Sequence, residues 1–203
     1  TDRAVKQLQT IREAVDRLEE IVSGFLSLAK ERELKLEPSR VDALLEECTR
    51  RVQQEAESRG IRLTTELRAG DAELWLDPKQ WSRAILNILI NGMEVCPRGG
   101  RVRLFSRLTD KACEVEIRDD GPGMSKEVLE RAFDPYFTTK PTGTGLGLSI
   151  ARGIIEEHGG TIELFSIEGQ GCQVLITMPF QANLEAAKAA MAADTSSLSL
   201  PQG

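Results

Sequence analysis

The N-terminal part of the chain carries a heptad pattern. Apolar residues recur at alternating steps of three and four, with charged residues between them, and no glycine interrupts the pattern before Gly24. About three heptads are the shortest run from which a coiled coil or helical bundle is inferred. We therefore expect a dimerising helix over residues 1–33; the alternative is a single amphipathic helix that lies on its own domain. The seam would consist of Leu8, Ile11, Val15, Leu18, Val22, Phe25 and Ala29.

From residue 41 the apolar positions alternate between helical and strand periods. Residues 41–58 are expected to form a helix that Gly60 ends, and residues 61–67 and 74–76 are expected to form strands. Asp77 and Pro78 are typical of the N-cap and the first position of a helix, which we expect to reach about Glu94. The buried face of this long helix is marked by Trp81, Ile85, Ile88 and Leu89.

Two hairpins complete the predicted fold. The first pairs residues 101–108 with 113–117, and the second pairs residues 160–166 with 172–178. The expected class is α+β: a two-layer α/β sandwich with one mixed sheet, helices on one face and an N-terminal coiled-coil helix. Residues 34–40 would be a linker, residues 41–180 the main domain, and residues 181–203 a tail that is partly helical or disordered.

Composition narrows the class of protein. The chain has 203 residues and a net charge of −6, which argues against general nucleic-acid binding. Cys48, Cys96, Cys113 and Cys172 show no paired spacing, so core positions in a reducing cytoplasm are expected rather than a zinc site or disulfides. No apolar run is long enough to span a bilayer. Because the chain starts on Thr1 rather than methionine, we expect it to be a piece of a longer protein, in which any membrane attachment would come through the missing N-terminal regions.

Two glycine clusters predict a nucleotide site. The first, residues 119–123, reads Asp-Asp-Gly-Pro-Gly and follows a predicted strand; the second, residues 143–148, reads Gly-Thr-Gly-Leu-Gly-Leu and opens an apolar run typical of a helix. Glycines at a helix start let backbone amides and the helix N-terminus approach phosphate. The chain lacks both the G-x-x-x-x-G-K-[ST] phosphate loop and the dinucleotide fingerprint G-x-G-x-x-G after the first strand.

Two asparagines on the long helix suggest a metal. Asn87 and Asn91 lie four residues apart, so their amides project from the same face. An unpaired buried amide costs about 1–3 kcal/mol, which favours backbone partners, a ligand or a metal. Side-chain carbonyl oxygens suit Mg²⁺ that is shared with substrate phosphates. The alternative is a pair of surface asparagines.

A segment between the glycine clusters has the features of a lid. Residues 133–142 concentrate aromatic side chains in a chain with only 4% aromatic residues, which predicts a loop with its own hydrophobic anchor that closes over a ligand. Lys140 is placed to reach a phosphate, and Thr138 and Thr139 offer hydroxyls. Alternatively, Phe133 and Phe137 simply pack the loop and Lys140 is a solvated charge.

The order of these motifs resembles that of sensor histidine kinases. Asn87-x-x-x-Asn91, residues 119–123, Phe133-Asp134-Pro135-Tyr136-Phe137 and residues 143–147 are similar to the asparagine box, first glycine box, phenylalanine box and second glycine box of that family. The resemblance spans about residues 1–180 and implies the Bergerat ATP-binding fold, shared with DNA gyrase, MutL and the ninety-kilodalton chaperones. Residues 1–33 resemble the second helix of the dimerisation and phosphotransfer domain, and residues 133–140 are most like nitrogen-regulation and metal-stress kinases.

The resemblance implies a role for each motif in binding ATP and Mg²⁺. Asp119 would accept a hydrogen bond from the adenine amino group, and Asn91, with Asn87 beside it, would bind Mg²⁺. Gly121 and Gly123 would let the backbone approach the nucleotide. The amides of Gly145, Leu146 and Gly147 would hold phosphate oxygens. The other candidates for ATP binding are Tyr136, Thr138, Thr139, Lys140, Gly143, Thr144, Leu148 and, through water, Thr177.

The resemblance also implies the activity of a protein-histidine kinase. The γ-phosphoryl group of ATP would pass to a histidine upstream of this chain and then to an aspartate of a response-regulator receiver domain. The expected partners are a second copy of the chain, bound through the N-terminal helix, and the phospho-acceptor helix of its own or the partner chain. A nucleotide-gated dimeric interaction module, or a non-kinase ATPase of the same superfamily, is the alternative.

The chain departs from the family pattern in three ways. Glu94 stands where a basic residue is common, and Gly92 stands where alanine is usual. The phospho-accepting histidine is missing, so no catalytic acceptor is expected in this chain. Its only histidine is His158, which is followed by two glycines and is interpreted as a helix cap.

Overall fold

A five-stranded mixed sheet forms one layer of the protein. The computed structural model describes residues 34–141, 143–185 and 188, so the predicted helix over residues 1–33 with its dimer seam, and most of the predicted tail, lie outside the described residues. The strand order is β2 (Arg62–Arg68), β4 (Arg101–Leu108), β5 (Ala112–Asp119), β7 (Cys172–Pro179) and β6 (Thr161–Ser166). Strands β2 and β4 are parallel, and the other neighbouring pairs of this sheet are antiparallel.

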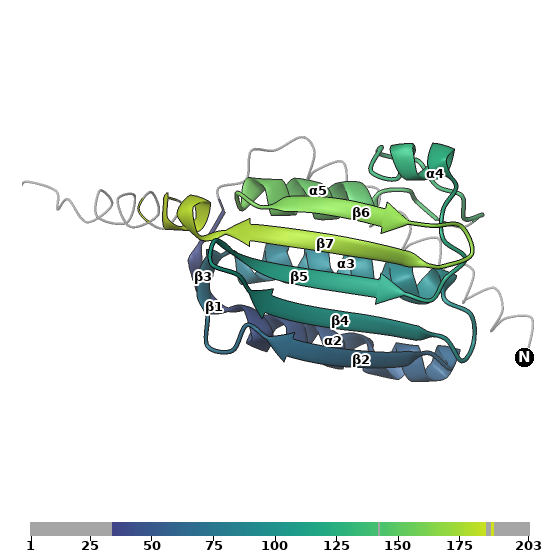
Figure 1. Cartoon of the computed structure of the whole chain (residues 1–203), viewed down its shortest axis with the longest axis horizontal. Coiled ribbons are helices and arrows are strands. Elements are labelled where there is room, and N and C mark those ends of the chain that lie inside the picture. The colour runs from purple at the N-terminus through teal and green to yellow at the C-terminus, as the bar shows by residue number, and fades with distance from the viewer. Residues whose placement is uncertain (1–33, 142, 186–187, 189–203) are drawn as a thin grey trace, which may run out of the picture.

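The second layer consists of helices on one face of this sheet (Figure 1). They are α2 (Val41–Arg59), α3 (Pro78–Val95) and α5 (Gly147–Glu157), and the short α4 (Lys126–Arg131) lies beside β6. The two hairpins β4–β5 and β6–β7 and the long helix have nearly the predicted bounds. The predicted fold class, a two-layer sandwich with a mixed sheet and helices on one face, is confirmed.

The core lies between the two layers. Side chains on these strands alternate between buried and partly exposed positions, as expected for a sheet with one covered face. Cys48, Cys96 and Cys113 belong to this core and are unpaired, as predicted for core positions. Its largest fully buried side chains include Trp81, Ile85 and Leu89 from α3 and Leu104, Ile176 and Met178 from the strands.

A second, two-stranded sheet corrects one boundary. Strand β1 (Glu37–Arg40) pairs antiparallel with β3 (Glu73–Leu76), so that Glu37 lies opposite Leu76. Residues 34–40 were expected to be a linker, and four of them instead form a strand. The short EPSR segment has no strand periodicity of its own. Its extended conformation depends on a partner strand more than 30 residues away, which local pattern does not reveal.

The capping residues of α3 and α5, Asp77 and His158, connect the two helices. Asp77 accepts hydrogen bonds from the amides of Lys79 and Gln80, each at 3.1 Å, and so caps α3 as predicted. His158 ends α5, which confirms its interpretation as a cap. Its Nδ1 donates to the carbonyl of Ile154 at 2.7 Å, and its Nε2 accepts from the Asp77 amide at 2.9 Å. One neutral imidazole therefore joins the end of α5 to the start of α3.

The packed domain extends slightly past its predicted end at residue 180. Residues 180–185 continue as a helix after β7. Asn183 is buried; its Oδ1 accepts from the Trp75 amide at 2.8 Å and its Nδ2 donates to the Trp75 carbonyl at 3.0 Å. This side chain therefore supplies the free edge of β3 with a partner. Of the helices in the described ranges, none combines the length and apolar character needed to cross a membrane.

Candidate functional site

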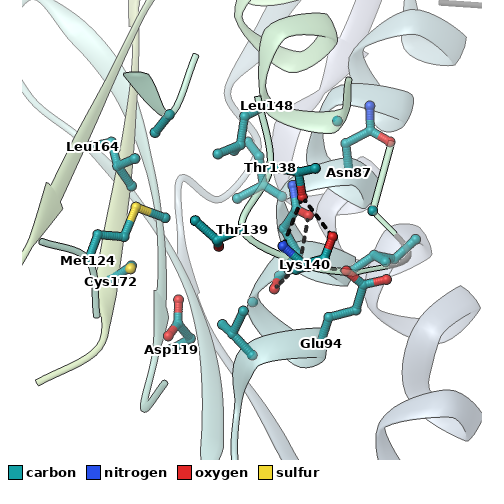
Figure 2. Close-up of a pocket in the computed structure, with 18 of the residues that line it drawn as sticks. Asn87, Glu94, Asp119, Met124, Thr138, Thr139, Lys140, Leu148, Leu164 and Cys172 are labelled. Atoms are coloured by element: carbon teal, nitrogen blue, oxygen red, sulfur yellow. Dashed lines mark hydrogen bonds and ion pairs between the residues drawn. The ribbon is translucent and has the colours of Figure 1, made fainter. Parts of the chain in front are cut away.

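The predicted motifs meet around one pocket of about 1560 Å³. It is bounded by α3, the start of α5, the ends of β5 and β7, and the lid segment, which we define as residues 133–145 with residue 142 not described. Figure 2 shows Asp119 on one side of the pocket and Asn87 and Lys140 on the other. Residues from distant parts of the sequence therefore share one cavity.

Asp119, the last residue of β5, supplies a carboxylate to the pocket. One of its oxygens, Oδ1, accepts from the Gly121 amide at 2.8 Å. Burial raises the pKa of the Asp119 carboxyl, while hydrogen bonds from the backbones of Gly121 and Cys172 oppose that shift. The neighbouring lining of Met124, Leu164 and Cys172 is apolar or weakly polar (Figure 2). Asp119 thus offers a hydrogen-bond acceptor next to apolar and weakly polar side chains.

Strand β7 contributes a residue that sequence reasoning missed. Cys172 lies opposite Asp119 in the strand register and lines the pocket. Thr177, the predicted contact, lies opposite Glu114 and does not line the pocket. It is an odd number of residues after Cys172, and because side chains alternate along a strand it faces the other side of the sheet. Cys172 replaces Thr177 as the candidate on this strand. The period-two pattern of residues 172–178 was the available signal, since Cys172 shares its face with the buried Val174.

The glycines of the first cluster serve internal packing. Gly123 has φ +71°, and a Cβ there would lie 2.1 Å from the carbonyl oxygen of Ile167. Gly171, with φ +82°, would place a Cβ 2.0 Å from the carbonyl oxygen of Asp119. The Gly169 amide also donates to the Pro122 carbonyl at 2.6 Å. Close approach was predicted to accommodate a nucleotide; here it joins the end of β5 to the β6–β7 turn. Gly123 also lines the pocket, whereas Gly121 does not.

The second cluster presents a helix N-terminus. Helix α5 starts at Gly147, and no side chain caps it. The lining includes Gly143, Thr144, Gly145, Leu146, Gly147 and Leu148. The first amides of a helix lack intrahelical partners and carry the positive end of its dipole. This corner of the pocket is therefore suited to an anion such as phosphate.

The lid segment is anchored by cation–π contacts. The Arg131 guanidinium lies 4.2 Å from the ring centre of Phe137, and that of Arg152 lies 5.4 Å from the ring centre of Phe133. Tyr136, with φ 65°, is 55% exposed and does not line the pocket, so its side chain is not placed for the predicted contact. Thr138, Thr139 and Lys140 do line it. The aromatic side chains that were predicted to anchor the lid are therefore held in part by two arginines, Arg131 and Arg152.

Helix α3 forms the opposite wall. Asn87 and Asn91 both line the pocket, as does Arg83 one turn earlier. Lys140 reaches across from the lid, and its Nζ donates to Asn91 Oδ1 at 3.2 Å and to a carboxylate oxygen of Glu94 at 2.5 Å (Figure 2). Lys140 is therefore not a solvated charge. A Cβ on Gly92 would lie 3.4 Å from that of Asp119, an ordinary contact that leaves room for alanine at this position.

Comparison with known proteins identifies the domain. Residues 76–182 match the family model described as histidine kinase-, DNA gyrase B-, and HSP90-like ATPase. The sensor histidine kinase ZraS of Escherichia coli O157:H7 is 32% identical over 171 residues, which cover 84% of this chain and 37% of that protein. The chain therefore spans little more than a third of this relative.

Solved structures give the same result. The nucleotide-free catalytic domain of the histidine kinase ThkA matches with a TM-score of 0.66 and 28% identity, covering 71% of this chain and 95% of that one. ThkA in complex with the response regulator protein TrrA matches with a TM-score of 0.73 and 27% identity, covering 86% of this chain and 50% of that one. The chain belongs to the family of histidine kinase-, DNA gyrase B- and HSP90-like ATPases.

Proposed function

We propose that this chain is the ATP-binding catalytic part of a sensor histidine kinase, which transfers the γ-phosphoryl group of ATP to a histidine on another segment. The observation that carries this proposal is a single pocket that combines a partly buried carboxylate, an uncapped helix N-terminus and an amide oxygen that faces a cation. The relatives named as sensor histidine kinases favour this proposal over another ATPase or a binding module.

Asp119 would select the base. An ionised carboxylate accepts hydrogen bonds and donates none. Adenine presents an amino group where guanine presents a carbonyl oxygen, so the Asp119 carboxylate attracts the first and repels the second. The surrounding wall includes Met124, Leu164 and Val174, whose apolar side chains offer a mismatched base no hydrogen-bond partner.

The residues on the other side of the pocket fit phosphates and Mg²⁺. The uncapped start of α5 suits phosphate oxygens, and Lys140 carries a positive charge into the same space. Asn91 Oδ1 already accepts from a cation, the Lys140 ammonium, and amide and carboxylate oxygens are preferred Mg²⁺ ligands. Bound Mg²⁺ would neutralise phosphate charge. The chain itself would position and orient ATP, because phosphoryl transfer needs mainly positioning and electrostatic stabilisation.

The acceptor histidine must belong to another segment. His158 is the only histidine of the chain, is 2% exposed, and has both ring nitrogens in hydrogen bonds. The proposed partners are a dimerisation and phospho-acceptor segment and, by analogy with ThkA bound to TrrA, the receiver domain of a response regulator. The buried, unpaired cysteines suit a cytoplasmic location.

Phosphotransfer to a supplied acceptor tests this proposal. The chain would be mixed with labelled ATP, Mg²⁺ and the separately produced histidine-bearing segment of Escherichia coli ZraS. We expect acid-labile label on that segment, no label with Asn91→Ala, and normal label with Gln53→Ala, which removes an exposed amide on α2. In parallel, calorimetry measures the binding of ATP and of GTP to the chain. Absence of ATP binding would refute the whole proposal, whereas ATP binding without transfer would refute the kinase activity alone.

A further inference from the structure

The ammonium group of Lys140 is held entirely by oxygens of α3. Its Nζ lies 3.2 Å from Asn91 Oδ1, 3.5 Å from the Asn91 carbonyl oxygen and 2.5 Å from a carboxylate oxygen of Glu94. Figure 2 shows Lys140 and Glu94 directed toward one another at the wall of the pocket. Both side chains are partly shielded, with 28% and 37% of their surfaces exposed. The three oxygens form a small acceptor cluster at the end of α3.

The chemistry of this cluster is that of a cation subsite. An amide oxygen, a carbonyl oxygen and a carboxylate together offer only acceptors and one negative charge. Lysine ends in a compact, strongly hydrated point charge, so it resembles a small cation more than a planar guanidinium does. The same oxygen types are those that Mg²⁺ takes from proteins. An ammonium bound here shows that the cluster accepts a cation in the nucleotide-free protein.

We propose that Glu94 is a second protein ligand of the divalent cation in this pocket, and that Lys140 holds the cation's place until the metal–nucleotide complex binds. This inference rests on the proposed function, because the cation arrives with the nucleotide. Glu94 stands where the sequence comparison with sensor histidine kinases led us to expect a basic residue. The Glu94 carboxylate would thus exchange the Lys140 ammonium for the divalent cation, so that it does not face the phosphates without a positive partner.

The exchange would be coupled to the lid segment. The Lys140 amide donates to Thr138 Oγ1 at 3.1 Å, and the Lys140 carbonyl accepts from the Gly143 amide at 3.2 Å. Lys140 therefore sits inside a hydrogen-bonded turn of the lid, and its side chain is tied to α3 only through Asn91 and Glu94. Release of the ammonium would leave Lys140 free to turn toward phosphate and would loosen the lid at the moment when the cation binds.

Three variants separate this exchange from an ordinary ion pair. Glu94→Gln removes the proposed ligand, and Lys140→Met removes the competing cation. Glu47→Gln is the matched control, because it also removes one carboxylate and one ion pair, with Arg51 on α2, outside the pocket. For each protein, ATP binding is measured by calorimetry across a Mg²⁺ titration and with EDTA. Hydrogen exchange of the amides of Thr138, Thr139 and Lys140 is measured without nucleotide.

We expect Glu94→Gln to raise the Mg²⁺ concentration needed for half-maximal ATP binding by about tenfold, as loss of a metal partner does. Metal-free ATP binding should become several-fold tighter, because no carboxylate opposes the phosphates. Lys140→Met should lower the Mg²⁺ requirement, and both variants should speed exchange in the lid relative to Glu47→Gln.

Two results would overturn the inference in different ways. If wild type binds Mg²⁺–ATP and Glu94→Gln has the same Mg²⁺ requirement as Glu47→Gln, the Glu94–Lys140 contact is an ordinary ion pair and the proposed function stands. If wild type binds no ATP at any Mg²⁺ concentration, the proposed function fails together with the inference. Unchanged lid exchange in both pocket variants would refute the coupling to the lid.

Discussion

The two sides of the pocket are built differently. The side with Asp119 is formed by paired strands and by the β6–β7 turn, whose backbones touch at Gly123 and Gly171. The side with Lys140 is formed by the lid segment, in which Thr138 and Thr139 are exposed and a few polar contacts reach α3. One side is fixed by main-chain packing, and the other is held by side chains that can exchange partners.

This difference separates recognition of the base from recognition of the phosphates. A carboxylate at the end of a central strand cannot move without disturbing the sheet, so base selection is preorganised. A segment held by an ion pair, two cation–π contacts and loop hydrogen bonds can open at low cost. We therefore expect mutations on the first side to affect folding or specificity, and mutations on the second side to affect nucleotide affinity and metal dependence.

The largest effect is expected at the β5 side, for Gly171→Ala. Its Cβ would collide with the Asp119 carbonyl at a positive φ, so we expect a loss of about 3 kcal/mol in the free energy of unfolding. Gly169→Ala is the control, because Gly169 has the same φ of +82° and nothing within 4 Å. Urea denaturation measures both. Equal losses of unfolding free energy in the two variants would mean that the β6–β7 turn does not pack closely against the end of β5 at Gly171.

Asp119→Asn should weaken ATP binding by about 2 kcal/mol, a factor of roughly 30, because a charged acceptor for the base is lost. The melting temperature should hardly fall, since burial disfavours this carboxylate in the folded protein and raises its pKa. Calorimetry with ATP and GTP measures the change in selectivity.

Asp120→Asn is the neighbouring control for that variant. Asp120 accepts hydrogen bonds from Arg101 and Arg103, the first of which chiefly lowers its pKa, and it does not line the pocket. Its replacement should leave ATP affinity unchanged. A loss of ATP affinity equal to that of Asp119→Asn would show that general negative charge, rather than one acceptor, selects the base.

Gly145→Ala tests the lid side in the same way. Its Cβ would lie 2.5 Å from the carbonyl carbon of Tyr136, so the lid has to shift. We expect several-fold weaker ATP binding but a loss of less than about 1 kcal/mol in the free energy of unfolding, because the lid opens independently of the core. Gly70→Ala, at φ +61° in open space, is the control. A global loss as large as that of Gly171→Ala would contradict the proposed difference between the two sides.

The smallest effect concerns pH and His158, which joins α5 to the start of α3. Burial lowers the pKa of His158 from 6.5, against the opposing influences of the Ile154 carbonyl and of Asp77 and Glu157. The unfolded chain therefore takes up this proton at higher pH than the folded one. This contribution to stability is complete above pH 6.5 and declines as the pH falls toward the lowered pKa.

His158→Gln should flatten that part of the pH profile, because glutamine does not titrate. Urea denaturation at a series of pH values below 6.5 measures the slope for both proteins. An unchanged slope in the variant would assign the pH dependence to other groups.

Local pattern predicted most of the fold. The apolar spacing of α2 and α3, the Asp77–Pro78 start and the two hairpins depend on neighbouring residues, so the sequence displays them directly. Strand β1 was missed because it exists only through its pairing with β3. The short α4 was also not predicted; it has six residues and none of them is buried, so it leaves almost no apolar pattern.

The candidate site was predicted unevenly. Its motif order indicated Asp119, Asn91 and the start of α5 together, because each has a local signature. The partner of Lys140 was not predictable, since Glu94 lies 46 residues away and had been considered only as a departure from a family pattern. Cys172 was assigned to the core with the other cysteines; the period-two pattern indicated its face of the strand, and strand register places it opposite Asp119.

The sequence by itself determined which residues carry chemistry and which local structures hold them: a carboxylate after a strand, two amides one helical turn apart, and glycines before a helix. The tertiary structure decided which of these share a pocket, why several of the glycines are required, and which cation faces Asn91. The physical reason is that local structure follows from the conformational preferences of adjacent residues. Contacts across the pocket depend on strand register and on packing between segments that are far apart in the chain.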